Sequence, residues 1–208
     1  NISHYPHELP NLNPPVLIKQ YVTEDFCDRM VAIAKQATVN PSGVFGQDKS
    51  EMISNYFRTS NFCRMPIEVY DEMKRVLERM MAYFVNSDGH YASIKLCEGI
   101  QFLQYNEQRN GHFSAHTDNA YFDAEGKFIY TSPQRTFTSV LYLNDDYEGG
   151  ELILNSVLDE NDQPIRLKPK KGEVVIFPSD VRFMHEVTPV TKGERYSVVG
   201  WYNAVRKP

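Results

Sequence analysis

The feature that most constrains the fold is a series of short β-prone segments, separated by turns, in the second half of the 208-residue chain. Many short strands at this spacing favour an antiparallel jelly roll or barrel over βαβ units. The sequence therefore predicts a mainly β core within residues 93–208. Its predicted strands are residues 94–105, 111–118, 136–144, 150–154, 163–167, 173–177, 183–187 and 195–202.

Residues 1–92 are expected to support this core with helices, so that residues 1–208 form one domain. After an irregular lead-in, residues 16–22 predict a short strand. Thr23 fits the N-cap of an amphipathic helix over residues 24–37, because acidic residues occupy its first turn.

A second, longer helix is predicted to begin at Pro66 and to run to about residue 85, with an apolar stripe suited to packing on a sheet. Between the two helices, residues 43–55 form a polar loop, which is either a flap over a site or an ordinary surface loop. Residues 56–63 predict a strand that carries Arg58.

Composition bounds the class of protein. Hydrophobic residues make up 41% and charged residues 24% of the chain, as in an ordinary globular protein. The net charge of −5 argues against a nucleic-acid partner. No run approaches the ~18 apolar residues of a membrane-spanning helix, so no membrane partner is expected. Three cysteines without paired spacing suggest reduced thiols and a cytoplasmic, intracellular location.

The strongest chemical signal is the triplet His116-Thr117-Asp118. Side chains two residues apart on an extended segment point to the same side, so His116 and Asp118 can hold adjacent positions on one metal ion. A second histidine, His185, follows in a later predicted strand. Two histidines and one carboxylate form the facial triad of non-haem Fe(II) sites. Alone, however, such a triplet also arises by chance, and a lone His185 also suits a surface or core position.

Arg195 lies in the last predicted strand, after His185. If this strand runs beside the metal, the guanidinium can fix a distant carboxylate bidentately. The alternative is a solvated face, since Lys192 and Glu194 are close in sequence.

The order of these residues resembles the 2-oxoglutarate- and Fe(II)-dependent oxygenases, specifically their prolyl 4-hydroxylase-like branch. The resemblance extends over about residues 95–203 and includes the segments 135–144, 148–152 and 169–177, with a weaker echo around Arg58. It implies a double-stranded β-helix, that is, a jelly roll of the cupin type, supported by N-terminal α-helices. It also implies Fe(II), 2-oxoglutarate and O2 as cofactor and cosubstrates, with ascorbate as an accessory reductant.

The activity that the resemblance implies is hydroxylation of an unactivated C–H bond, coupled to decarboxylation of 2-oxoglutarate to succinate. The expected substrate is a prolyl residue in a protein or peptide. Catalysis and metal binding fall to His116, Asp118 and His185. The carboxylate at Asp118 predicts hydroxylation, because related halogenases carry a small residue there.

The resemblance also assigns binding roles, each beside a structural alternative. Arg195 would pair with the far carboxylate of 2-oxoglutarate, and four residues would complete its pocket: Tyr105, Tyr142, Leu152 and Trp201. Core packing explains these four equally well. Substrate contacts are expected from Arg58, Asn119, Tyr121 and Arg135, with surface ion pairs as the alternative for the arginines. His112 is expected to lie behind the ligands or to face the substrate.

Two competing functions stay open at this point. One is an oxygenase of the same chemistry that acts on a free amino acid or another small molecule. The other is a jelly-roll binding module without catalysis, which the complete set of metal and cosubstrate residues argues against.

Overall fold

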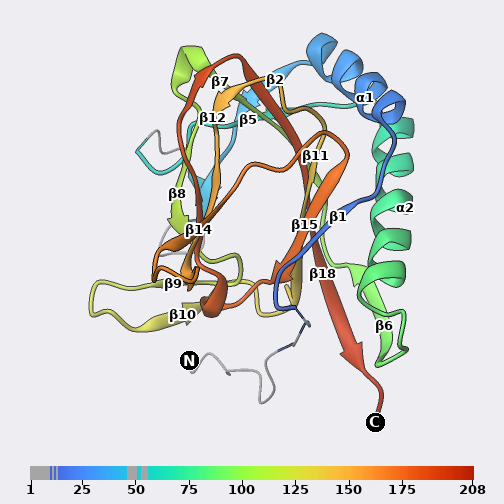
Figure 1. Ribbon diagram of the computed structural model, residues 1–208, viewed down its shortest axis with the longest axis vertical. Coiled ribbons are helices and arrows are strands. Elements are labelled where there is room, and N and C mark those ends of the chain that lie inside the picture. The colour runs from blue at the N-terminus through green and yellow to red at the C-terminus, as the bar shows by residue number, and fades with distance from the viewer. Residues whose placement is uncertain (1–9, 11, 13, 46–50, 53–55) are drawn as a thin grey trace.

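In a computed structural model, which describes residues 10, 12, 14–45, 51–52 and 56–208, two β-sheets face each other and two helices cover one of them (Figure 1). The larger sheet has eight strands, and β6 (Tyr91–Leu96) pairs with the far part of β18. The other seven lie in the order β1 (Leu17–Gln20), β15 (Glu173–Pro178), β11 (Phe137–Tyr142), β18 (Glu194–Arg206), β7 (Gln101–Asn106), β5 (Asn61–Cys63) and β2 (Val39–Pro41).

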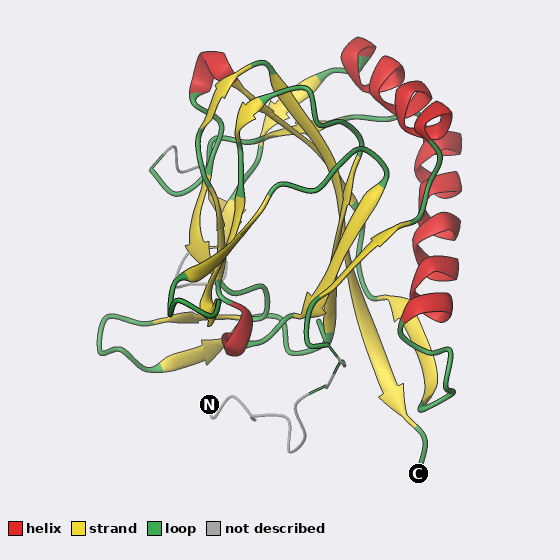
Figure 2. Ribbon diagram, viewed as in Figure 1, coloured by secondary structure: helices red, strands yellow, loops and turns green. Residues whose placement is uncertain are grey.

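The smaller sheet completes the jelly roll. Its four antiparallel strands lie in the order β14 (Pro164–Leu167), β13 (Leu152–Leu158), β16 (His185–Val187) and β8 (Phe113–His116). Figure 2 shows that these strands face the larger sheet across an interior, with the helices on the opposite side of the larger sheet. The prediction of a mainly β jelly roll with supporting N-terminal helices is confirmed.

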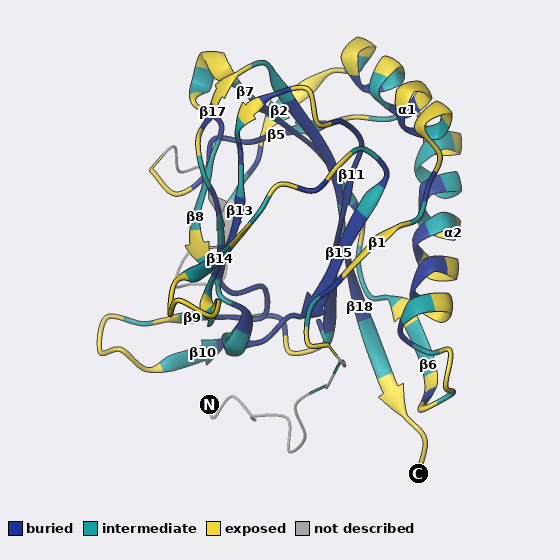
Figure 3. Ribbon diagram, in the orientation of Figure 1, coloured by how far each residue is buried: buried dark blue, intermediate teal, exposed yellow. Residues whose placement is uncertain are grey.

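The larger sheet separates two apolar cores, as strand alternation requires. Along β18, Tyr196, Val198 and Tyr202 enter the core on the helix side. Val199 packs against the core between the sheets, which contains Tyr105 and Tyr142. Both faces of this sheet are therefore buried, as the dark ribbons of Figure 3 show.

Both predicted helices are present. Helix α1 (Glu24–Gln36) begins as expected, because the hydroxyl of Thr23 accepts a hydrogen bond from the backbone N–H of Phe26 at 3.2 Å. Helix α2 (Ile67–Phe84) follows Pro66 and buries an apolar stripe against the larger sheet: Met73, Leu77, Met80 and Met81. Among the described residues, no helix is long and apolar enough to cross a membrane.

Several strand boundaries differ from the prediction. The expected strand 94–105 is two strands, because a turn at Gly99 packs on α2 so closely that an added Cβ would lie 2.7 Å from the Tyr70 hydroxyl. The expected strand 56–63 is regular only in β5, and Arg58 forms an isolated bridge with Phe113. The N-terminal region is more than helical support, since β1, β2 and β5 extend the larger sheet.

Three short two-stranded sheets among the described residues differ from the predicted strand set. Strands β9 (Ala120–Phe122) and β10 (Phe128–Tyr130) pair within the segment that follows Asp118. Strand β12 (Glu148–Gly149) pairs with β17 (Val190–Lys192). Strands β3 (Val44–Phe45) and β4 (Glu51–Met52) pair within the predicted loop 43–55, the rest of which lies partly outside the described residues.

Candidate metal and cosubstrate site

The structure brings His116, Asp118 and His185 together between the two sheets. His116 ends β8 and lies opposite His185, which begins β16. The Oδ1 atom of Asp118 lies 3.3 Å from Nε2 of His116 and 3.4 Å from Nε2 of His185. One donor atom from each residue lies within 4.8 Å of the other two, a spacing that one metal ion can bridge.

Neighbouring groups fix the orientation of all three side chains. Nδ1 of His116 donates to the carbonyl oxygen of Ser114 at 2.7 Å, and Nδ1 of His185 donates to that of Phe183 at 2.8 Å. This fixes a proton on Nδ1 of each ring and turns Nε2 toward Asp118, so that Nε2 is the metal-binding nitrogen once it carries no proton. The hydroxyl of Thr138 donates to Oδ2 of Asp118 at 2.6 Å, which leaves Oδ1 facing the imidazoles.

Electrostatics within the cluster suit a divalent cation. Burial favours a raised pKa for Asp118, but the charge of His185 and hydrogen bonds from both imidazoles hold it well below its usual value. Burial, together with the charge of His185, lowers the pKa of His116. Burial opposes protonation of His185 as well, yet the carboxylate of Asp118 raises its pKa overall. A buried carboxylate anion therefore faces two imidazoles that can exchange a proton for a metal.

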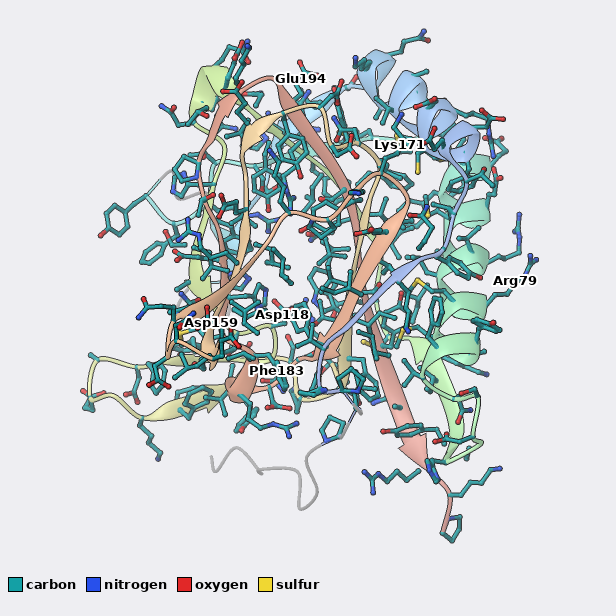
Figure 4. The ribbon with its side chains drawn as sticks, viewed as in Figure 1. Arg79, Asp118, Asp159, Lys171, Phe183 and Glu194 are labelled. Carbon is teal, nitrogen blue, oxygen red and sulfur yellow. The ribbon has the colours of Figure 1, made fainter. Side chains whose placement is uncertain are left out.

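Aromatic rings enclose the cluster. The ring of Phe113 stacks on His116, with centroids 3.6 Å apart and an interplanar angle of 18°. Phe177 presents its edge to His185 at 4.9 Å between ring centroids. In Figure 4, Asp118 and Phe183 lie near one end of the space between the sheets, and Glu194 lies at the opposite end. These rings cover one face of each imidazole, while the side chain of His116 stays 21% exposed.

Arg195 lies in the same interior with only 1% of its surface exposed. One of its terminal nitrogens donates to Ser197 at 3.0 Å and the other to the hydroxyl of Tyr142 at 2.8 Å. Its guanidinium carbon lies 4.8 Å from the ring centroid of Tyr105 and 4.7 Å from that of Tyr142. Within the described part of the chain, no carboxylate forms an ion pair with Arg195. A buried cation without an anion is costly, so the site fits an anionic ligand.

The other predicted pocket residues lie around this interior. Burial raises the pKa of Tyr142 to about 12, so its phenol keeps the proton that it can donate to a carboxylate. Leu152 on β13 is buried in the core between the sheets with Tyr105 and Tyr142. Trp201 pairs in register with Thr138, and its indole N–H has no hydrogen-bond partner. Their ligand roles stay predictions.

Both arginines predicted to bind substrate are engaged within the protein. Arg58 donates to Ser60 at 2.6 Å, to the carbonyl of Gly43 at 3.1 Å and to Gln101 at 3.2 Å. Arg135 forms a bidentate pair with Glu98 and donates to the backbone carbonyl of Asp118 at 2.8 Å. Its guanidinium also lies 3.9 Å from the ring centroid of Trp201.

The two remaining substrate candidates lie in or beside the β9–β10 hairpin. Asn119 is buried, and its side-chain oxygen has no hydrogen-bond partner. Tyr121 is half-buried on β9, opposite Ile129. Their contacts with a substrate stay predictions. His112 lies outside the metal cluster, because its ring bonds to Thr59 and to the carbonyl of Tyr56.

Three residues of the site were missed: Thr138, Phe113 and Tyr147. Strand alternation in the segment 136–144 places Thr138 on the face of Tyr142, which was the available signal. Alternation places Phe113 on the face opposite His116, so periodicity gives no signal for it; the register of β8 against β16 is irregular between these two residues. Tyr147 lies in the turn after β11, where sequence periodicity gives no direction.

The class of protein follows from this fold and site: a jelly-roll oxygenase with a buried His-Asp-His metal centre and an anion pocket. The sequence model described as the 2OG-Fe(II) oxygenase superfamily matches residues 100–203. The chain therefore belongs to the 2-oxoglutarate- and Fe(II)-dependent oxygenase superfamily. Fe(II) and 2-oxoglutarate are accordingly its metal and its cosubstrate, and the three clustered side chains fit that metal.

The chain is similar to prolyl hydroxylases. Prolyl 3-hydroxylase 2 of Homo sapiens is 25% identical over 217 residues, which cover 95% of this chain but only 30% of that protein. A Pseudomonas putida prolyl-4-hydroxylase structure has a TM-score of 0.59 at 17% identity, covering 93% of this chain and 94% of that one. A Trichoplax adhaerens prolyl hydroxylase, in complex with a hypoxia inducible factor peptide fragment, has a TM-score of 0.67 at 19% identity, with 91% and 83% covered. The enzyme is thus a 2-oxoglutarate- and Fe(II)-dependent oxygenase whose similar proteins include prolyl hydroxylases, and it spans about a third of the length of the curated relatives.

Proposed function

We propose that this oxygenase hydroxylates a proline residue within a peptide or protein. The observation that carries the chemistry is the unpaired guanidinium of Arg195, buried in the same interior as the cluster of His116, Asp118 and His185. The prolyl substrate is supported by the relatives, which are named as prolyl hydroxylases, one of them solved with a peptide fragment.

One set of residues would bind the metal and another set would bind 2-oxoglutarate. Bound Fe(II) supplies the activation of O2, while 2-oxoglutarate is decarboxylated to succinate. His116, Asp118 and His185 would hold the metal on one side and leave its remaining positions to ligands. Arg195, with Tyr142 as a second donor, would anchor the far carboxylate of 2-oxoglutarate. Phe113 and Phe177 pack on the two ligand imidazoles and would limit the access of water to the bound metal.

A turnover assay tests the substrate class. Succinate formation is measured with Fe(II), 2-oxoglutarate and ascorbate, using proline-containing peptides, matched peptides with alanine for proline, and free amino acids. We expect stimulation by the proline peptides alone and the gain of one oxygen atom on proline by mass spectrometry. The sequence resembles the prolyl 4-hydroxylase-like branch without fixing the hydroxylated carbon, and the similar proteins include both a prolyl 3-hydroxylase and a prolyl-4-hydroxylase. Product analysis therefore includes the ring position.

Two other results of this turnover assay would support the competing functions. Stimulation by a free amino acid and by no peptide would indicate a small-molecule hydroxylase. No turnover of 2-oxoglutarate under any condition would indicate a binding module without catalysis.

Substitutions test the assigned roles. His116→Ala and His185→Ala each delete a metal ligand, so Fe-dependent turnover should be lost. Arg195→Ala should instead raise the concentration of 2-oxoglutarate needed for half-maximal rate. An unchanged requirement would place the anchor elsewhere.

A further inference from the structure

Tyr147 lies beside Arg195 in the turn between β11 and β12, with 4% of its surface exposed. Gly150 lies next to both side chains and has no side chain of its own to push them apart. A Cβ added at Gly150 would lie 3.1 Å from Cδ of Arg195 and 3.1 Å from Cε2 of Tyr147. From its other side, Lys168 donates to the backbone carbonyl of Tyr147 at 2.6 Å, and its ammonium lies 4.9 Å from the ring centroid. The phenol of Tyr147 is thus held against the arginine.

Two buried donors in this pocket have no acceptor. Among the described residues, no group meets the hydroxyl of Tyr147 or Nε of Arg195 at full hydrogen-bond geometry, although the guanidinium lies close enough to lower the pKa of that phenol against the effect of burial. Both terminal nitrogens of the guanidinium are engaged. Burial raises the pKa of Tyr147, so its hydroxyl keeps its proton and is available as a donor. Buried polar groups are nearly always hydrogen-bonded, and two neighbouring donors without an acceptor indicate that an anionic ligand supplies it.

We propose that Tyr147 determines cosubstrate specificity by donating a hydrogen bond to the same carboxylate that Arg195 anchors. The proposal rests on the role of Arg195 given under Proposed function. A carboxylate that meets the guanidinium and this phenol together satisfies both donors. A 2-oxo acid without a second carboxylate leaves both unsatisfied, so Tyr147 selects 2-oxo diacids over 2-oxo monoacids.

Binding measurements on the full chain test this without turnover. The protein is loaded with Mn(II), and calorimetry gives the dissociation constants of 2-oxoglutarate and of pyruvate for the native protein and for Tyr147→Phe. Loss of one hydrogen bond to a charged group should weaken 2-oxoglutarate binding about 10-fold or more. Pyruvate binding should not change. The melting temperature of the ligand-free variant should be equal or higher, because the substitution deletes an unpaired buried hydroxyl.

The matched control is Tyr202→Phe. The hydroxyl of Tyr202 is also buried but contacts Ser139 at 2.7 Å on the helix side of the sheet. This variant should lose stability and keep its affinity for 2-oxoglutarate.

Two results overturn the proposal: a Tyr147→Phe affinity for 2-oxoglutarate within twofold of native, or equal weakening for pyruvate. Arg195→Ala, measured in parallel, shows which proposal has failed. If Arg195→Ala weakens binding and Tyr147→Phe does not, only the role of Tyr147 is wrong. If neither variant weakens binding, the carboxylate anchor itself lies elsewhere.

Discussion

Phe113 lies flat on His116, with ring centroids 3.6 Å apart, and the guanidinium of Arg58 lies 4.5 Å from the centroid of the same phenyl ring. A metal-ligand imidazole is therefore packed through one aromatic ring against a buried cation. Since Arg58 also donates to the carbonyl of Gly43, this contact joins the metal site to the segment that leads into the β3–β4 pair.

Phe113→Leu should weaken metal binding about 10-fold, because it removes the flat surface that fixes the orientation of the His116 ring. Titration of the metal-free protein with Mn(II) measures the effect. Phe122→Leu is the control, since Phe122 is exposed on β9 and should leave the affinity unchanged. Equal affinities for Phe113→Leu and the native protein would show that the hydrogen bond to Ser114 alone orients His116.

Thr138→Val should also reduce the affinity for Mn(II) about 10-fold, because Oδ2 of Asp118 would lose its hydroxyl donor. Thr138→Ser keeps that donor and should restore most of the affinity. If the valine and serine variants bind the metal equally, the hydrogen bond to Asp118 has no part in orienting the carboxylate.

Arg135→Lys tests whether Arg135 supports the metal site through Asp118 or contacts the substrate. The lysine keeps the charge but loses the planar fork that joins Glu98 to the backbone of Asp118. We expect a metal affinity lowered about 10-fold. Arg166→Lys, on an exposed pair with Glu151, is the control. A raised KM for the peptide with unchanged metal affinity would instead support the substrate contact that the sequence predicts for Arg135.

The stability of the fold should depend on the helix-side core far more than on surface ion pairs. Leu77 lies on the inner face of α2 and is fully buried, so Leu77→Ala should cost about 2–5 kcal/mol in the free energy of unfolding. Glu72→Gln breaks the exposed pair between Glu72 and Arg29 and should cost at most about 1 kcal/mol. Urea denaturation measures both, and a reversed order would contradict this account.

The buried thiols should be almost inert in the native protein. Burial raises the pKa of Cys27 to about 11, and likewise that of Cys63 to about 11. At pH 8 roughly one molecule in a thousand carries either thiolate, and this fraction rises about tenfold per pH unit until the pKa is reached. Iodoacetamide labelling at pH 7, 8 and 9 follows the rate, with urea-unfolded protein as the control. Rapid labelling of either residue at pH 7 would contradict the prediction.

The jelly roll and the metal cluster could be predicted from strand alternation within short segments, taken together with the resemblance of the whole pattern to the oxygenase family. Alternation places His116 and Asp118 on one side of an extended segment, and His185 lies in another predicted strand. The pairing of β8 with β16, which a jelly roll provides, then brings His185 opposite His116 and completes the cluster.

What the sequence missed depends on contacts that periodicity does not encode. The break at Gly99 follows from its packing against Tyr70 on α2. The internal bonds of Arg135 depend on Glu98, which lies in that same turn. Tyr147 lies in a turn, where periodicity does not predict the direction of a side chain, and its proximity to Arg195 depends on contacts around Gly150 that only the folded chain shows.

Strand β18 carries Arg195 and Trp201 on one face and part of the helix-side core on the other. Removing or adding one residue between them would turn the later side chains to the wrong face and destroy both layers together. An insertion or deletion in this strand should therefore destabilise the protein, whereas the β9–β10 pair is a separate two-stranded sheet and should tolerate one better. The spacing between the Arg195 guanidinium and the Trp201 indole is thus set by the register of a single strand.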